Sequence, residues 1–495
     1  MDRLTKRRFL KNLALAGGAV VAAPLLAACG SAPAATPAPA KATEAPKPTE
    51  VAKPTEAPKP TAAAAKPTEA PKATEAAKPT VAPAAKAPPK EIVTLRFHMR
   101  TGGEKSEPSI YQQRPDEWSQ ETGHKYKLEP IPGGQDYVPK LEALAASNTI
   151  GDLTWTSDVY SEHTHFVKYN VLAPVDEFLG PYNVKKTEWF QPIVDTLTYN
   201  GKMYGLPKTG HPGDSYIWIN LNAFQEAGIK EPPTYGNTFD DIVNWAVKLA
   251  KGPKDRRDVY GYYSNVGGIM PITNAIRQFG GDVVDKEGKK SLADSDQWMS
   301  WLQWNDRIIN QEKVHPLADS IPSGGLESLF GSGKLAMVHT QRYFQRAARV
   351  AVGDKFKFTT IQFPRGSNPK GWAICIDTHS GTAASKYKEV TFTLLYALAD
   401  RRFAYLVGKD SGYLTGRVDN LDALKELASD HFIQLQQKCV EQGEQFWRAA
   451  NLRAYEFQTA LTNNLDLLWL GKRKLDKSYL TDMKNALDEV LAKPA

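Results

Sequence analysis

Cysteine is scarce in this chain: there are three among 495 residues, and they form no paired motif of the kind that holds zinc. A basic excess is also missing from most of the chain. The net charge is +7, but residues 1–90 hold the whole excess, and residues 91–495 carry 48 basic and 49 acidic side chains. This balance argues against a basic face for nucleic acid, so we expect no nucleic-acid partner.

The N-terminal apolar run, Leu13–Ala28, is short for a membrane span and follows a basic head, which predicts an export signal over residues 1–29. The sequence LAACG at 26–30 resembles the lipobox of bacterial lipoproteins. This resemblance implies a lipid on Cys29 that anchors the exported protein to the cell membrane. The segment Thr5–Lys11 resembles the twin-arginine export motif, with Lys6 in place of the first arginine. The twin-arginine and general secretory routes therefore both stay open.

Residues 30–90 repeat alanine, proline, lysine, threonine and glutamate in near-copies of KPTEAPKPTE. Such a segment has too little apolar surface to offset the entropy lost on ordering, and its prolines favour extended spacing. We expect a disordered linker that holds the folded part away from the anchor. A recognition motif for proline-binding domains is the alternative.

The folded part, residues 91–495, is predicted to form two or more lobes, because its length exceeds what one core usually serves. Its first third alternates strands and helices, a pattern typical of a mostly parallel sheet with right-handed crossovers. The predicted strands are Glu91–His98, Lys125–Pro130 and Gly151–Thr156, and the predicted helices are Tyr111–Thr122 and Tyr137–Ser147.

The stretch Gly201–Ile229 is predicted to link two lobes. Lys202–Pro207 resembles a short strand that ends at its proline, and Lys208–Asp214 resembles a polar turn. The predicted hinge between the lobes is Tyr204–Pro207. An aromatic strand, Ser215–Asn220, then precedes a short helix. Further strands are predicted at Lys334–Val338, Phe356–Phe363 and Lys370–Ile376, and further helices at Thr238–Lys251, Asn274–Phe279, Gln297–Ile309, Lys386–Ala399 and over most of 401–491.

Several short motifs, taken in order, resemble the extracellular solute-binding proteins of bacterial ABC importers, in particular the large family around the maltose- and sugar-binding proteins. The motifs are Gly-Asp-Leu at 151–153, GKMYGLP at 201–207, Phe-Gly-Gly at 279–281, FGSGKLAM at 330–337, the glycine-tryptophan strand at 371–376 and Gly-Tyr-Leu at 412–414. Together they cover nearly all of residues 91–495.

This resemblance implies an α/β, two-lobe periplasmic-binding-protein-like fold of type II, with a ligand cleft between the lobes and chain crossings near 206–215 and 364–372. It places lobe 1 at 91–206 and 366–415, lobe 2 at 207–365, and a helical part at 416–495 mainly in lobe 2. It further implies a monomer that binds a mono- or oligosaccharide and delivers it to permease subunits, with no catalysis and no cofactor.

Candidate ligand-binding residues are aromatic, carboxylate, amide and arginine side chains near the ends of strands, because sugars offer apolar C–H faces beside dense hydroxyl groups. Tyr216 and Trp218 share one strand face, so they are expected either both to bind or both to pack in the core. The full candidate set is Arg100, Glu104, Trp155, Asp158, Tyr160, Asp214, Tyr216, Trp218, Gln341, Arg342, Tyr343, Gly371 and Trp372. Trp298, Trp301 and Trp304 follow helical spacing and are assigned to the core.

Alternatives remain at this point. A non-sugar polar solute, such as a polyamine or a polyol phosphate, fits the same fold, and a secreted glycoside hydrolase would also carry many tryptophans but needs two positioned carboxylates. His163 and His165 are two residues apart, yet without nearby ligands they are predicted to face solvent rather than bind metal. Cys375 and Cys439 are either free or paired.

Overall fold

The computed structural model describes residues 91–101, 107–133, 137–157, 162–411, 414–419, 431–446 and 449–494. The predictions for Cys29, the export signal and the linker lie outside the described residues, as do the candidates Glu104, Asp158 and Tyr160. No helix within the described ranges is both long and apolar enough to cross a membrane.

The first sheet has five strands in the order β2-β1-β3-β11-β6. Its strands are β1 (Thr94–Thr101), β2 (Lys125–Pro132), β3 (Leu153–Ser157), β6 (Leu206–His211) and β11 (Cys375–Gly381). β1 pairs in parallel with β2 and β3, which confirms the parallel arrangement predicted for the first three strands. β11 returns from late in the chain and pairs antiparallel with both β3 and β6.

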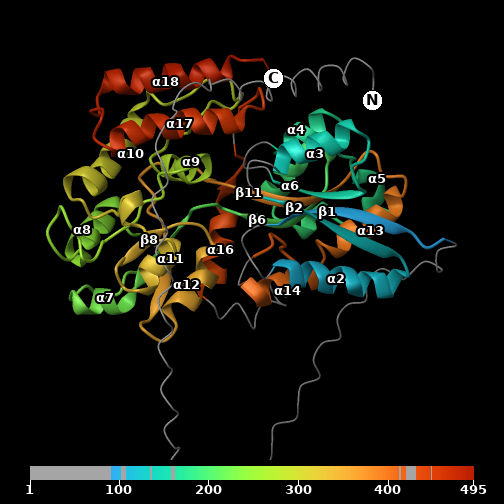
Figure 1. Cartoon of the computed structure of the whole chain (residues 1–495), viewed down its shortest axis with the longest axis horizontal. Coiled ribbons are helices and arrows are strands. Elements are labelled where there is room, and N and C mark those ends of the chain that lie inside the picture. The colour runs from blue at the N-terminus through green and yellow to red at the C-terminus, as the bar shows by residue number, and fades with distance from the viewer. Residues whose placement is uncertain are drawn as a thin grey trace, which may run out of the picture. The chain divides into compact units, whose positions relative to one another are not determined.

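Helices cover both faces of this sheet (Figure 1). α2 packs with α13 and α14 on one side, while α3 and α4 contact β2 and β3 and α6 contacts β6. Their bounds are α2 (Glu107–Thr122), α3 (Tyr137–Ala146), α4 (Glu162–Lys168), α5 (Asp176–Leu179), α6 (Gln191–Leu197), α13 (Lys388–Ala397) and α14 (Arg401–Ser411), with a 3-10 turn at Lys186–Glu188 and a small pair of strands, β4 (Thr198–Tyr199) and β5 (Lys202–Met203).

The second sheet has three antiparallel strands in the order β8-β7-β9, namely β7 (Tyr216–Asn220), β8 (Met337–His339) and β9 (Phe358–Gln362). A separate parallel pair joins β10 (Trp372–Ala373) to β12 (Gly443–Glu444). The surrounding helices are α7 (Leu221–Glu226), α8 (Phe239–Leu249), α9 (Ile269–Gln278), α10 (Asp296–Asp306), α11 (Gly325–Gly331), α12 (Phe344–Val352), α16 (His431–Glu441), α17 (Ala454–Trp469) and α18 (Lys477–Leu491), with short turns at Arg307–Gln311 and Ala318–Ser320.

Each sheet has its own apolar core. The core of the second sheet contains Trp298 and Trp301, which are at most 1% exposed, together with Trp304 at 8%, as their helical spacing predicts. Trp298 also donates its indole N–H to the carbonyl oxygen of Asp282 over 2.9 Å, so a buried polar atom is satisfied. Much of the aromatic content of this lobe therefore serves packing rather than binding.

The link between the two sheets differs from the prediction at Pro207. The strand predicted to end there instead continues, because β6 runs through Pro207 to His211. β6 is an edge strand, and a proline costs no ladder hydrogen bond where the N–H would face away from the partner strand. The chain leaves the first sheet after His211 and enters the second at Tyr216, so the segment between the sheets follows the predicted hinge at Tyr204–Pro207.

The second crossing lies between the end of β9 at Gln362 and the start of β11 at Cys375. The single strand predicted over Lys370–Ile376 is split: β10 pairs with β12, while β11 belongs to the first sheet and extends to Gly381. Both cysteines of this region, Cys375 and Cys439, are buried free thiols. The Cys439 sulfur accepts a hydrogen bond from the Gln362 amide over 3.2 Å.

Candidate functional site

One edge of each sheet lies where the chain crosses between the sheets, and the strand register determines which residues lie at these edges. In the first sheet, Ser157 at the end of β3 pairs with Asp377, and His211 at the end of β6 pairs with Cys375. In the second, Tyr216 at the start of β7 pairs with Gln362 at the end of β9. Because ligands of α/β proteins bind beyond strand ends, we take these two edges as the candidate site.

Asp214, in the first crossing, is the centre of the most ordered polar group at these edges. Its carboxylate is fully buried. Oδ1 accepts a hydrogen bond from Asn265 Nδ2 over 2.8 Å, and Oδ2 accepts one from Gln341 Nε2 over 3.1 Å. The Asp214 carbonyl oxygen lies 2.9 Å from Nε2 of His339. One acidic residue thus ties together three segments that are far apart in the sequence.

The electrostatics of this group follow from its burial. Burial raises the pKa of Asp214 to about 7, although the amides of Asn265 and Gln341 favour the ionised form. Burial lowers the pKa of His339 to about 4, so this ring is neutral at physiological pH. Asp214 therefore has no cationic imidazole beside it, and its charge is met by amide donors.

Aromatic side chains flank the same group. Tyr343 follows Gln341 by two residues and is 41% exposed. Tyr263 precedes Asn265 by two residues, and burial raises its pKa to about 12. An exposed ring close in sequence to an oriented amide is a combination that suits a sugar.

The edge of the first sheet is built differently. Trp155, on β3, is 3% exposed and meets the Tyr137 ring edge-on, with centroids 5.3 Å apart. The Arg100 guanidinium lies over the Trp155 ring at 4.6 Å from its centroid. The tyrosine also donates its hydroxyl to the Trp155 carbonyl over 2.7 Å, which fixes the strand and the ring together. Trp155 and Arg100 are thus brought together, as a stacked pair.

Four other candidates lie in packed surroundings. Tyr216 and Trp218 are at most 1% exposed and both contact the Phe432 ring, so the two share one environment, which is the core. Trp372 is fully buried, with the Arg365 guanidinium 5.4 Å from its ring centroid, and the neighbouring Gly371 donates its N–H to Glu444 over 3.0 Å. We do not carry these four residues into the proposed site.

Arg342 is also engaged within the chain: it is 6% exposed and donates from Nη1 to the carbonyl of Leu414 over 3.2 Å. Leu414 belongs to the core of the first sheet, whereas Arg342 follows β8 of the second. The contact is therefore a link between the two lobes.

A single asparagine holds both crossings. Asn274, on α9, is fully buried; its Nδ2 donates to the Pro212 carbonyl over 3.1 Å and its Oδ1 accepts from the Ala373 N–H over 2.7 Å. Gly213, next to Pro212, has a φ of +55°, and a Cβ there would lie 2.4 Å from the Asn274 amide nitrogen. The first crossing thus needs glycine at this point.

Sequence reasoning missed Asn265, Tyr263 and Asn274. Asn265 lies outside any strand end that the pattern predicts, and nothing in its local sequence points to Asp214, 51 residues away. The helix that carries Asn274 begins at Ile269, five residues before the predicted start. Asn274 is one of several buried polar residues on this helix, together with Thr273, Arg277 and Gln278, so its residue type alone did not single it out.

The predicted solvent exposure of the two histidines is wrong for His163. It is 2% exposed, and its Nδ1 lies 3.0 Å from the Thr156 hydroxyl. His165 instead pairs with Glu142 over 2.7 Å. No group of three or more metal-ligating side chains occurs within the described ranges.

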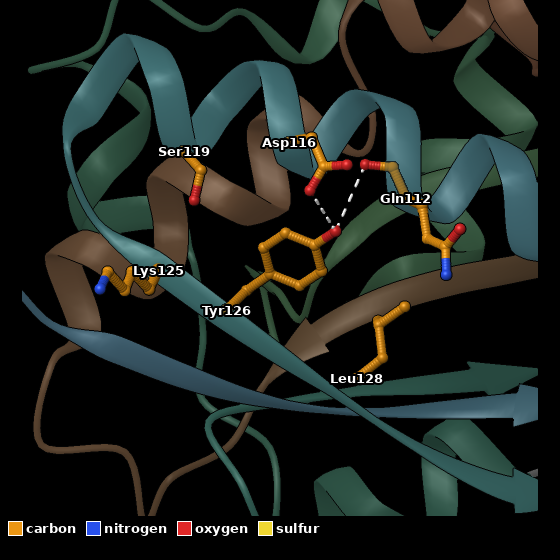
Figure 2. Close-up of a pocket in the computed structure, with 6 residues that line it drawn as sticks. All are labelled: Gln112, Asp116, Ser119, Lys125, Tyr126 and Leu128. Carbon is orange, nitrogen blue, oxygen red and sulfur yellow. Dashed lines mark hydrogen bonds between the residues drawn. The ribbon is translucent and has the colours of Figure 1, made fainter.

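One surface hollow of about 400 Å³ lies away from the crossings, between α2 and β2 (Figure 2). Figure 2 shows the Tyr126 hydroxyl directed at α2, where it donates to Asp116 over 2.7 Å. Ser119 on α2 and Lys125 at the amino end of β2 also line the hollow, which therefore lies away from the edge where the parallel strands end. We therefore do not assign the solute site to this hollow.

Comparison with known proteins defines the class of the chain. The model of the family described as bacterial extracellular solute-binding protein matches residues 102–400. The chain belongs to this family, which confirms the predicted resemblance. No match was found among curated protein sequences.

Solved structures show the same fold. The sugar-binding protein MalE from Xanthomonas citri has a TM-score of 0.69 at 15% identity, with 81% of this chain and 97% of that chain covered. An ABC substrate-binding protein from Listeria monocytogenes in complex with cycloalternan has 0.68 at 16%, covering 81% and 99%. A solute-binding protein from Agrobacterium vitis with bound D-mannitol has 0.61 at 19%, covering 80% and 98%. The predicted two-lobe α/β fold is thereby confirmed.

Proposed function

We propose that this protein captures a carbohydrate between its two lobes, closes on it, and delivers it to the permease of an ABC importer. The observation that carries the proposal is the group around Asp214, in which a buried carboxylate orders Asn265 and Gln341, while the exposed ring of Tyr343 follows Gln341 by two residues. Sugar recognition uses this combination of oriented polar groups and an aromatic face.

The neighbouring structures support a carbohydrate over other solutes. Three of them hold cycloalternan, mannobiose and maltotetraose as bound molecules. D-mannitol, in the Agrobacterium vitis structure, makes a linear polyol the second candidate for this chain. Family and neighbours are binding proteins rather than enzymes. The transport energy would come from a separate ATPase.

The ligand contacts that we propose are Tyr343, Gln341 and Asn265 from the second lobe and Trp155 with Arg100 from the first. Closure then requires contacts that exist only in the closed state, since a solute shifts an equilibrium only by its differential affinity for the two states. Glu104, Asp158 and Tyr160, which lie outside the described residues, stay candidates.

Membrane attachment is part of the proposal. The LAACG sequence at 26–30 supports a lipid on Cys29, and residues 30–90 would act as the spacer between that lipid and the binding lobes. The proposal also includes export by the twin-arginine or the general secretory route and a monomeric state. Mass spectrometry of the protein extracted from membranes tests the anchor: a diacylated N-terminal cysteine is expected, and an unmodified Cys29 would contradict it.

A ligand screen tests the function. Mannobiose, maltotetraose, cycloalternan and D-mannitol are added to the purified protein, and thermal unfolding is followed. At a ligand concentration of 100 times Kd, binding stabilises the fold by about 2.7 kcal/mol. A saturable shift with no product by chromatography supports the proposal. Hydrolysis of an oligosaccharide would instead make the protein a glycoside hydrolase, and a shift only with polyamines would reassign the solute.

A further inference from the structure

The turn between α17 and α18 exposes two leucines of the second lobe. Leu467 is 37% and Leu470 is 58% exposed, although Leu468 and Trp469 between them are buried. α17 and α18 lie side by side and are joined at the end that lies away from the first sheet (Figure 1). One exposed leucine is ordinary, but two of them one helical turn apart form a small apolar patch outside the candidate solute site.

Basic side chains follow these leucines directly. Lys472, Arg473 and Lys474 are consecutive and exposed, and Lys477 is exposed at the start of α18. Residues 91–495 as a whole are nearly neutral, with 48 basic and 49 acidic side chains. The basic run is therefore a local feature of this turn rather than part of a general basic excess.

The backbone of the turn holds the patch in place. Gly471 has a φ of +67°, which a glycine adopts without strain. The N–H groups of Lys472 and Arg473 both donate to the Leu467 carbonyl, over 2.8 and 3.0 Å. The Arg473 guanidinium also donates to Asp482 on α18 over 2.7 Å. The leucines and the basic residues are thus presented together by an ordered turn.

The acidic side chains near the turn are mostly engaged in bonds of their own. Asp482 pairs with Arg473, and Asp476 caps α18 by accepting from the Tyr479 N–H over 2.8 Å. Asp466, on the last turn of α17, is exposed. Three lysines form no ion pair with any residue that the structure describes, namely Lys472, Lys474 and Lys477. The exposed charge of the turn is therefore mostly that of ammonium groups.

Ammonium groups beside aliphatic side chains suit the surface of an anionic bilayer. Lysines are attracted to anionic lipid head groups, and leucines enter the boundary between head groups and acyl chains. The proposed lipid on Cys29 would hold the protein close to such a surface and raise its effective concentration there, so that even a weak contact is populated.

We propose that the α17–α18 turn is a second membrane contact, in which Leu467, Leu470, Lys472 and Lys474 dock on the anionic head groups of a bilayer. The inference rests on the proposed anchoring for its setting, but the contact itself needs no acyl group on the protein. Docking would fix the orientation of the second lobe, whereas a tether attached at one point limits only its distance from the membrane.

Vesicle flotation tests the contact without the anchor. Residues 30–495 contain every described element of the fold and lack Cys29, so no acyl group contributes. Binding to vesicles of phosphatidylglycerol and phosphatidylcholine is expected to be at least ~10-fold tighter than binding to phosphatidylcholine alone, and to weaken as salt is added. Equal binding to the two kinds of vesicle, or binding to neither, overturns the inference and leaves the anchoring at Cys29 intact.

A second pair of lysines is a matched control that assigns the contact to the turn. Lys289 and Lys290 are also consecutive and exposed, but the residues on either side of them are buried. Lys472→Gln combined with Lys474→Gln is expected to weaken binding to anionic vesicles ~20-fold, about fivefold for each lysine. Lys289→Gln combined with Lys290→Gln is expected to change it less than ~2-fold. The lysines of residues 30–90 are present in every variant, so equal losses in the two double variants overturn the inference.

The apolar part of the contact has its own pair of variants. Leu470→Ser is expected to weaken vesicle binding about fivefold, whereas Val350→Ser, at a residue on α12 that is 83% exposed, leaves it unchanged. Both side chains are exposed, so both variants should keep the wild-type thermal stability. Sedimentation without vesicles detects the other occupant, a second copy of the chain. A dimer that Leu470→Ser disrupts, or equal vesicle binding by the two variants, overturns the inference.

Discussion

The two candidate edges differ in what is already assembled. At the second sheet, hydrogen bonds from Asn265 and Gln341 fix the polar groups around Asp214, and the Tyr343 ring is 41% exposed. At the first sheet, the Trp155 ring is buried between Tyr137 and Arg100. A preordered surface loses less entropy on binding than one that must rearrange. The polar surface of the second lobe is therefore the better preordered of the two.

The largest expected effect is a difference in protein stability between variants of Trp155 and of Tyr343. Trp155→Ala removes a buried ring and is expected to lower the free energy of unfolding by about 3–5 kcal/mol, whereas Tyr343→Ala, at an exposed ring, should change it by less than ~0.5 kcal/mol. Tyr343→Ala should nevertheless weaken solute binding by about tenfold. Denaturant unfolding and calorimetry measure the two quantities. If Tyr343→Ala left the affinity unchanged, the second-lobe surface would be wrongly placed.

The next effect concerns the residue that holds both crossings. Asn274→Leu leaves the Pro212 carbonyl and the Ala373 N–H without their partner and is expected to cost about 2–4 kcal/mol. Asn305→Leu is the control, because Asn305 is as buried but its bonds to Ser264 and Trp301 stay within one lobe. Both variants should lose stability, but only Asn274→Leu should change the solute affinity and the radius of gyration. If both variants changed the solute affinity and the radius of gyration equally, Asn274 would have no particular role in holding the two crossings.

The third prediction uses the pKa of Asp214, which burial raises from 3.8 to about 7. The stability that this group contributes is full below its unfolded pKa and is lost as the pH rises through about 7, because the folded state holds the proton more tightly. Between pH 5 and pH 8 the wild type should therefore lose about 2 kcal/mol relative to Asp214→Asn, which does not titrate.

Thermal unfolding across that range measures the difference. His339, whose pKa is lowered to about 4, acts in the opposite sense and at lower pH, where its stability contribution is lost as the pH falls. It is present in both proteins, so it cancels from the comparison. Parallel pH profiles for wild type and variant would show that Asp214 is not held in a buried site.

The smallest effect concerns a contact that joins the lobes at another place. The Tyr455 hydroxyl, on α17, donates to Glu162 on α4 over 3.0 Å, and Lys168 donates to the Ala450 carbonyl over 3.3 Å. Tyr455→Phe removes one hydrogen bond and should weaken solute binding about threefold, mainly through faster release. Tyr479→Phe, whose bond to the Asn464 carbonyl lies within one lobe, is the control. Equal effects of the two variants would exclude a role in closure.

The elements themselves were largely predictable. Period-two and helical patterns located β1, β2, β3, α2 and α3 to within a few residues, because side-chain direction follows directly from the backbone repeat. The error at Pro207 has a tertiary cause, since a proline is tolerated only if its strand lies at a sheet edge. The split of Lys370–Ile376 into β10 and β11 likewise depends on two partner strands that the local sequence does not name.

The candidate site was less predictable, because residue type alone does not decide whether a side chain packs or binds. Trp372 and Tyr343 are both aromatic residues near strand ends, yet the first is fully buried and the second 41% exposed. Gln341 and Tyr343 were proposed from their position after a strand, and Asp214 from the stretch that links the two lobes. Asn265 was not, since its role depends on a contact across 51 residues.

By itself, the sequence determined the class of this protein, its two-lobe α/β fold and the neutral charge of its folded part, because composition, periodicity and the order of motifs are properties of the chain. The tertiary structure alone decided which polar groups meet. The pairing of Asp214 with Asn265 and Gln341, and of Asn274 with both crossings, exists only when distant segments are packed together. Burial then sets the pKa of Asp214 and the direction in which the amides point, because desolvation depends on surroundings that no local pattern encodes.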